Sequence, residues 1–215
     1  MRFYVFIAKK LMNSNKGIGK FTGLISKIGI AIGSLALILA VSILNGFENQ
    51  LNKKISDFDG HIKISGIGFN FDTSIFDSFK EILMISPNRE RQGIIDYKSN
   101  RKVVTFKEIN MDLLEDFYQL PIIGNIPNDE QILIGYDIAN RLGIKVGDKI
   151  IISSPLDRIS MLSFIPVLKV QVSGLFYSKI LDYDNKFIFI SKNVGKRIFH
   201  SVSNIKYLDI KVNNN

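Results

Sequence analysis

The sequence of 215 residues predicts an α+β protein in which one N-terminal membrane helix extends into a stalk and is followed by a mixed α/β domain. Two observations support this fold class. An uncharged apolar run extends from Ile28 to Leu44, and the chain beyond it alternates strand-like and helix-like apolar patterns between short turns. We expect a basic amphipathic segment at 1–20, the membrane helix at 21–47, the stalk at 48–60 and the domain at 61–215.

The apolar run is long enough to cross a hydrocarbon core of about 30 Å. The charged residues before it are all basic: Arg2, Lys9, Lys10, Lys16, Lys20 and Lys27. Acidic and basic residues are mixed after it, so the positive-inside rule predicts a cytoplasmic N-terminus and an exported domain. The alternative is a secretory signal cleaved near Ala40-Val41-Ser42. Because the apolar core is longer than the usual ~7–15 residues of a signal, we favour a retained anchor.

The formal net charge of +8 is concentrated in the first 27 residues. This basic bias therefore indicates membrane topology and contact with anionic lipid, and no nucleic-acid partner is expected. The chain contains no cysteine, so the domain folds without disulfides and has no thiolate chemistry. Phe3, Phe6, Ile7 and Leu11 have helical spacing, which predicts a short helix on the cytoplasmic membrane surface; an ordinary basic flank is the alternative.

Small residues share one face of the predicted membrane helix, and larger apolar residues continue this face into the stalk. These residues are Gly29, Gly33, Ala36, Ala40, Phe47 and Leu51. Small residues allow two helices to approach closely in a bilayer, so we expect this face to pack against another helix. Gly60 is expected to end the stalk in a left-handed C-cap.

The domain is expected to consist mainly of strands with helices packed on them. The predicted strands cover residues 61–65, 91–97, 101–107, 131–135, 149–153, 167–175, 186–190 and 205–212. Helices are expected from Asp72 or Thr73 to Leu83, around 113–117, at 136–142 and at 191–199. Residues 156–166 are expected to form a loop or hairpin tip, and Asp182 to Asn185 a hairpin turn, although paired carboxylates or a calcium loop are alternatives for the latter.

No catalytic constellation is present in the sequence. His61 and His200 lack metal-binding spacing, and there is no GxSxG motif and no phosphate-binding loop. We therefore expect a protein that is not an enzyme, with no catalytic residue, metal or cofactor.

Several motifs resemble the first membrane helix, stalk and exported domain of the lipoprotein-releasing permeases, which are relatives of the FtsX and MacB permeases. The first is SKIGIAIG at 26–33, followed by Asn45, Gly46, Phe47 and Glu48 in SILNGFE and then by GHI at 60–62. IGYDIANRLGIKVGDK at 134–149 is similar to the strand, helix and turn of that family's exported domain, and VSGLF at 172–176 with DYD at 182–184 resembles its next landmark.

The resemblance implies a periplasmic domain of two α/β pieces and a permease subunit of an ABC transporter in a bacterial inner membrane. Its implied partners are a separate cytoplasmic ATPase, a second permease subunit that is identical or homologous, a periplasmic lipoprotein carrier, the lipoprotein cargo and membrane lipid. Such permeases have further spans after the domain, and this sequence has none. We therefore expect a fragment, a split reading frame, or a subunit completed by another polypeptide.

The resemblance also places a carrier-binding hairpin at residues 156–166. Its apolar residues Met161, Leu162, Phe164 and Ile165 are the candidate carrier contact. The alternative is that these side chains pack into their own domain. Two other functions remain open: an FtsX-like or MacB-like permease piece that transmits ATPase motion to periplasmic partners, and a free-standing anchored binding domain.

Overall fold

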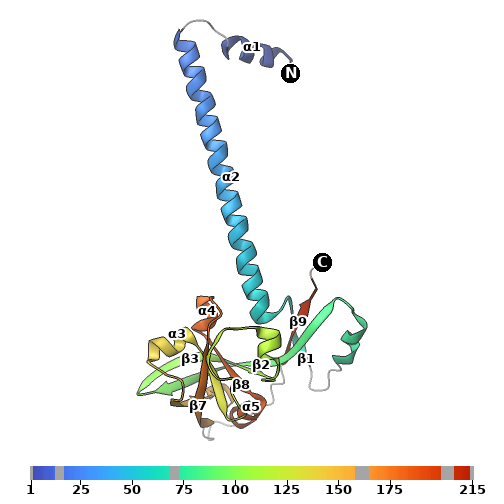
Figure 1. The fold of residues 1–215 in the computed structure, drawn as a ribbon, viewed down its shortest axis with the longest axis vertical. Coiled ribbons are helices and arrows are strands. Elements are labelled where there is room, and N and C mark those ends of the chain that lie inside the picture. The colour runs from blue at the N-terminus through green and yellow to red at the C-terminus, as the bar shows by residue number, and fades with distance from the viewer. Residues whose placement is uncertain (1, 13–16, 68–72, 158–164, 200–205, 214–215) are drawn as a thin grey trace. The chain divides into compact units, whose positions relative to one another are not determined.

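The computed structural model describes residues 2–12, 17–67, 73–157, 165–199 and 206–213 (Figure 1). Its contacts divide the chain into two compact units, Met1–Leu51 and Asn52–Asn215, which are described separately.

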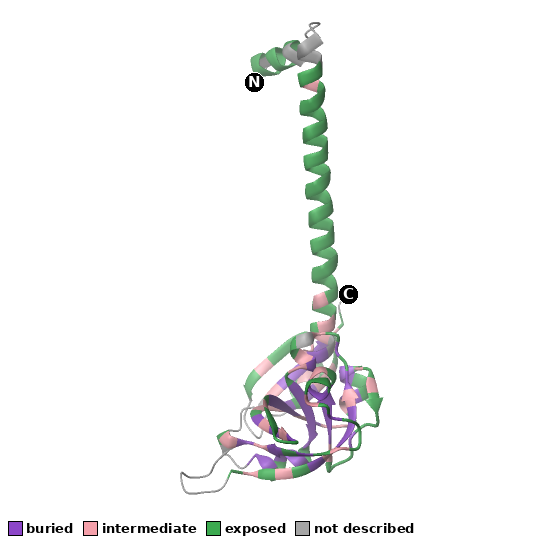
Figure 2. Cartoon of the chain, turned by 90° about the vertical axis from the view of Figure 1, so that its left-hand side faces the viewer, coloured by how far each residue is buried: buried purple, intermediate pink, exposed green. Residues whose placement is uncertain are grey.

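The first unit is helical. It contains α1 (Arg2–Met12) and most of α2 (Gly17–Asp59), whose last turns belong to the second unit. By length and composition, the segment Phe21–Ser56 of α2 is suited to cross a membrane, and most of its apolar side chains are exposed (Figure 2). The predicted long apolar N-terminal helix is confirmed. Because α2 is continuous, no break marks the proposed change from membrane helix to stalk.

The second unit is built on one mixed sheet. Its described strands are β1 (Ile62–Ile67), β2 (Ile82–Tyr97), β3 (Asn100–Ile109), β4 (Ile122–Gly124), β5 (Gln131–Gly135), β6 (Lys149–Ser153), β7 (Val167–Phe176), β8 (Phe187–Ser191) and β9 (Lys206–Val212). The main strand order is β1-β9-β2-β3-β8-β5-β7-β4, and β6 pairs with both β2 and β7. Within this order β3–β8 and β5–β7 are parallel pairs.

Short helical elements connect these strands. They are the 3-10 helices η1 (Thr73–Ser78) and η3 (Pro155–Asp157), the π-helix η2 (Leu114–Tyr118), and the α-helices α3 (Tyr136–Leu142), α4 (Leu181–Asp184) and α5 (Lys192–Ile198). The expected α+β fold is confirmed.

The long strand β2 joins two parts of the sheet. Its first half pairs with β9, which in turn pairs with β1, and its second half pairs with β3 and β6. One buried apolar cluster is formed by side chains that include Ile95, Phe106 and Ile188, together with α3 and α5 residues. A second cluster, described below, contains Phe58 from the last turn of α2.

Two local predictions are wrong. The helix expected to reach Leu83 ends at Ser78, because Ile82 already pairs with Val212 and begins β2. Asp182 to Asn185 do not close a hairpin, since β5 lies between β7 and β8; instead α4 forms a helical turn there. In both places, pairing with a distant strand decides the structure where the local pattern suggested another one.

Gly60 follows α2 in the left-handed conformation expected of it, with φ +74°. A Cβ at this position would lie 2.8 Å from the carbonyl oxygen of Ile210, whereas Gly66, with φ +80°, has open space around the same position. We expect Gly60→Ala to lower the free energy of unfolding by about 2–3 kcal/mol and Gly66→Ala by about 1 kcal/mol. Thermal unfolding of the full chain in detergent, followed by circular dichroism, compares the two. Equal losses would contradict the proposed backbone overlap.

Candidate functional site

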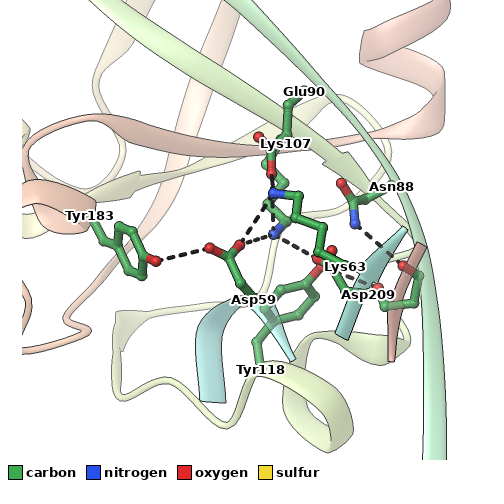
Figure 3. A network of polar contacts seen from close by, with 9 residues as sticks. Asp59, Lys63, Asn88, Glu90, Lys107, Tyr118, Tyr183 and Asp209 are labelled. Carbon is green, nitrogen blue, oxygen red and sulfur yellow. Dashed lines mark hydrogen bonds and ion pairs between the residues drawn. The ribbon is translucent and has the colours of Figure 1, made fainter. Parts of the chain in front are cut away.

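Charged side chains lie together on one face of the sheet, at the strands nearest the end of α2, and two of them, Lys107 and Asp209, are fully buried (Figure 3). The strand register brings them together. Asp209 of β9 is the cross-strand partner of both Lys63 in β1 and Ser86 in β2, and Glu90 of β2 is the partner of Lys107 in β3. Cross-strand partners project to the same face of a sheet. We call Asp59, Lys63, Glu90, Lys107 and Asp209 the Lys107 network.

Lys107 is the centre of this network and is fully buried. Its ammonium donates a hydrogen bond of 2.8 Å to Asp59 Oδ1 at the end of α2, and it lies 2.8 Å from Asp209 Oδ2 and 3.4 Å from Glu90 Oε1. The contact with Asp209 is an ion pair in which neither side chain is accessible to solvent. One cation therefore joins three chain segments.

Asp59 has further partners. Tyr183 donates a hydrogen bond of 2.8 Å to its Oδ2, and Lys63 lies 3.6 Å from its Oδ1. Lys63 also donates a hydrogen bond of 2.7 Å to Glu90. The carboxylate at the end of the helix is thus shared between two cations, while Lys107 retains two carboxylates of the sheet besides Asp59.

An aromatic cluster lies directly beside these charges. Phe58 is fully buried, and its ring centroid is 4.2 Å from that of Tyr183, 5.1 Å from Phe187 and 5.5 Å from Phe189. The ammonium of Lys107 lies 4.9 Å from the centre of the Phe58 ring, within cation–π range. Two consecutive residues therefore fix the last turn of α2 to its domain. Phe58 does so by its buried ring, which we call the Phe58 plug, and Asp59 by its ion pair with Lys107.

The environment shifts the ionisation of these groups in different directions. Burial acts to raise the pKa of Asp59, but the charge and hydrogen bond of Lys107 outweigh it, so the pKa is below its ordinary value. Burial raises the pKa of Asp209, although Lys107 opposes this. Burial acts to lower the pKa of Lys107, and Tyr118 and the three carboxylates raise it overall. Lys107 is consequently a permanent cation at physiological pH.

These shifts give opposite pH dependences. Native Asp209 binds its proton at a higher pH than the unfolded chain does, so the free energy of unfolding should rise as the pH falls from its raised pKa towards 3.8. Asp59 contributes fully above 3.8, and its contribution is lost as the pH falls through its lowered pKa. We expect Asp209→Asn to remove the first effect and Asp59→Asn the second. Melting temperatures of the full chain measured across acidic pH test this, and identical pH profiles for both variants would contradict it.

The described part of the chain contains no group of three His, Cys, Asp or Glu residues that could hold a metal ion. A lysine that stays protonated between carboxylates is neither a nucleophile nor a base. What this arrangement can do is hold a helix end against a sheet.

Comparison with known proteins identifies the family. A family model described as the MacB-like periplasmic core domain matches residues 24–215. The chain belongs to this family. Among curated relatives, the lipoprotein-releasing system transmembrane protein LolC of Neisseria meningitidis is 26% identical over 183 residues, which cover 79% of this chain and 44% of the relative. The corresponding LolE protein of Haemophilus influenzae is 28% identical over 138 residues, covering 57% of this chain and 33% of the relative.

The chain therefore spans less than half the length of these relatives. The predicted resemblance to the N-terminal part of a LolC-like or LolE-like permease of the MacB type is confirmed. Among solved structures, the periplasmic region of MacB from Actinobacillus actinomycetemcomitans aligns with 71% of this chain and 68% of its own, with 11% identity and a TM-score of 0.47.

The sequence-predicted site residues of this MacB-like chain lie elsewhere. The proposed helix-packing residues Gly29, Gly33, Ala36, Ala40, Phe47 and Leu51 are all in α2. A Cβ at Gly29 or Gly33 would meet no other atom within 4 Å, so this face is open. The motif Asn45 to Glu48 lies in the interior of α2. Neither set belongs to the Lys107 network.

The proposed carrier contact falls largely outside the described residues. Met161, Leu162 and Phe164 are not described, while Ile165 is, and it is exposed. The flanking strands β6 and β7 pair in antiparallel register as far as Ser153 and Val167, so this segment connects the two strands of a hairpin. Whether it binds a carrier stays a prediction. His200 is also outside the described residues, and His61 accepts a hydrogen bond from the backbone of Val212.

The Lys107 network was not predicted from the sequence. The residues two positions away on the same face include Thr105 beside Lys107, and Tyr207 and Lys211 beside Asp209, so the strand pattern does not mark either position as part of an apolar core. Charged residues are rarely fully buried unless they are paired.

Proposed function

We propose that this chain is the N-terminal portion of a permease subunit of an ABC transporter that extracts lipoproteins from the bacterial inner membrane and passes them to a periplasmic carrier. The observation that supports this most strongly is the likeness to LolC across 79% of the chain, together with a helix in this chain that is long and apolar enough to span a membrane. ATP hydrolysis would be carried out by a separate cytoplasmic subunit, and a second permease subunit would complete the transport path.

The proposed work is energetically demanding. At about 0.8 kcal/mol for each buried CH₂ group, a single 16-carbon chain resists extraction from the bilayer by roughly 12 kcal/mol. A lipoprotein with several acyl chains therefore needs a machine driven by ATP. In this proposal α2 lines the path of the lipid anchor with its partner helix packed along Gly29, Gly33, Ala36 and Ala40.

The orientation follows from charge. We propose that α1 lies on the cytoplasmic surface of the inner membrane, with Phe3 and Phe6 in the interface and Lys9 and Lys10 near anionic headgroups. Both phenylalanines are exposed in the structure, as an interfacial helix requires. The second unit would then lie in the periplasm.

The hairpin between β6 and β7 is the proposed carrier contact. Deletion of residues 161–165 is expected to abolish copurification of the carrier from cells that produce the full-length permease. The domain should remain folded, because these residues follow the last paired positions of β6 and precede those of β7. Circular dichroism of the deletion variant provides the control. Undiminished carrier copurification would refute this assignment.

Depletion of the protein in its own organism tests the proposed transport function. We expect lipoproteins destined for the outer membrane to accumulate in the inner-membrane fraction of a sucrose gradient. Normal lipoprotein sorting combined with a defect in septum hydrolysis or in drug efflux would instead favour an FtsX-like or MacB-like role. Normal behaviour in all three assays would leave an anchored binding domain.

A further inference from the structure

The carboxylate partners of Lys107 come unequally from the helix and from the sheet. Lys107 has three carboxylates within ion-pair distance, and only one of them, Asp59, comes from α2. The other two, Glu90 and Asp209, belong to strands of the same sheet as Lys107 itself. If the end of α2 moves away, the buried ammonium therefore keeps two counter-charges.

On the helix side of the network, the charge of Asp59 can also be compensated after separation from Lys107. Asp59 is partly exposed, with 21% of its side-chain surface accessible, whereas Lys107 and Asp209 have none. Lys63, which lies 3.6 Å from Asp59 and 2.7 Å from Glu90, is also partly exposed. When Asp59 separates from Lys107, solvent and Lys63 can compensate its charge. The unfavourable burial of an unpaired charge is thus avoided on both sides.

We propose that Asp59 is a positioning residue that holds the last turns of α2 on the sheet through a releasable ion pair, and that transport requires this pair. The role in transport depends on the proposed permease function. An ATP-driven permease must move its membrane helices, and in this chain the described contacts between the last turn of α2 and its domain include the Phe58 plug and the ion pair of Asp59 with Lys107. Of the two, the ion pair is the contact that can be broken without exposing apolar surface.

If Asp59 positions the helix end, its substitution should loosen α2 and leave the sheet unchanged, whereas a purely structural residue would destabilise both. Asp59→Asn removes the charge and leaves Lys107 paired with Asp209 and Glu90. We therefore expect backbone amides of residues 52–59 to exchange hydrogen at least about tenfold faster, while those of β3 and β9 keep their wild-type rates. Asp59→Glu retains a carboxylate and should restore most of the protection.

Hydrogen exchange followed by mass spectrometry, with the full chain in detergent, makes this comparison. The matched control is Asp96→Asn, which removes the same charge from an exposed ion pair with Arg101 at 2.7 Å and should change no rate in α2. If β3 and β9 accelerate as much as α2 does, the network is a single structural unit and the proposal fails. It also fails if no rate changes.

A second experiment measures lipoprotein sorting in the depleted strain after complementation with each variant. We expect Asp59→Asn to be produced at the wild-type amount and to leave lipoproteins in the inner membrane, while Asp59→Glu and Asp96→Asn restore sorting. Full sorting by Asp59→Asn, together with accelerated exchange in α2, would refute the requirement for the ion pair. If depletion of the wild-type protein itself leaves sorting normal, the transport function fails, and the exchange data alone decide whether Asp59 positions the helix.

Discussion

Replacement of Phe58 by alanine is expected to lower the free energy of unfolding of the second unit by about 3–5 kcal/mol, the range for a fully buried aromatic residue. The ring is inaccessible to solvent and touches aromatic residues from η2, α4 and β8. Its removal would leave a cavity at the point where helix and sheet meet. Chemical unfolding of the full chain in detergent, followed by circular dichroism, measures the loss.

Phe47→Ala is the control for this substitution. Phe47 lies in the same helix, and its side chain is exposed, so its truncation should change the stability of the domain by less than about 0.5 kcal/mol. Comparable losses for both variants would show that the effect does not depend on burial of the ring, and the role assigned to Phe58 as a plug would have to be abandoned.

Lys107→Met is expected to be similarly costly, at about 3–5 kcal/mol, because it leaves Asp209 buried without its cation. The double variant Lys107→Met with Asp209→Asn should recover part of this loss, since no isolated buried charge remains. Unfolding free energies of the two single variants and the double variant form a thermodynamic cycle. Strict additivity would mean that the two residues do not interact, contrary to the distance of 2.8 Å between them.

The sequence was most informative where the structure depends on local pattern. The apolar run predicted α2, the short apolar stretch from Ile132 to Ile134 predicted β5, and the glycine at position 60 predicted the end of the helix. These features are determined by residues that lie next to one another in the chain.

Prediction failed where pairing between distant segments decides the structure. Ile82 and Leu83 fit a helical apolar face, but β9 recruits this segment into β2. The Lys107 network depends on the same pairing, because the register of β9 against β2 and of β3 against β2 determines which charges share a face. Nothing near Lys107 in the sequence identifies Asp59 or Asp209 as its partner.

The position of Phe58 and Asp59 just before β1 has a mechanical consequence. The backbone hydrogen bonds between β1 and β9 begin next to the bond from His61 N–H to the carbonyl of Ile210. In an antiparallel pair these bonds run perpendicular to the strands. Tension applied at the start of β1 would therefore break them one at a time, starting from that end. A pull through α2 reaches the aromatic plug and the ion pair first. The contacts of these two residues therefore resist the force first, and they protect the hydrogen bonds between β1 and β9 from being broken.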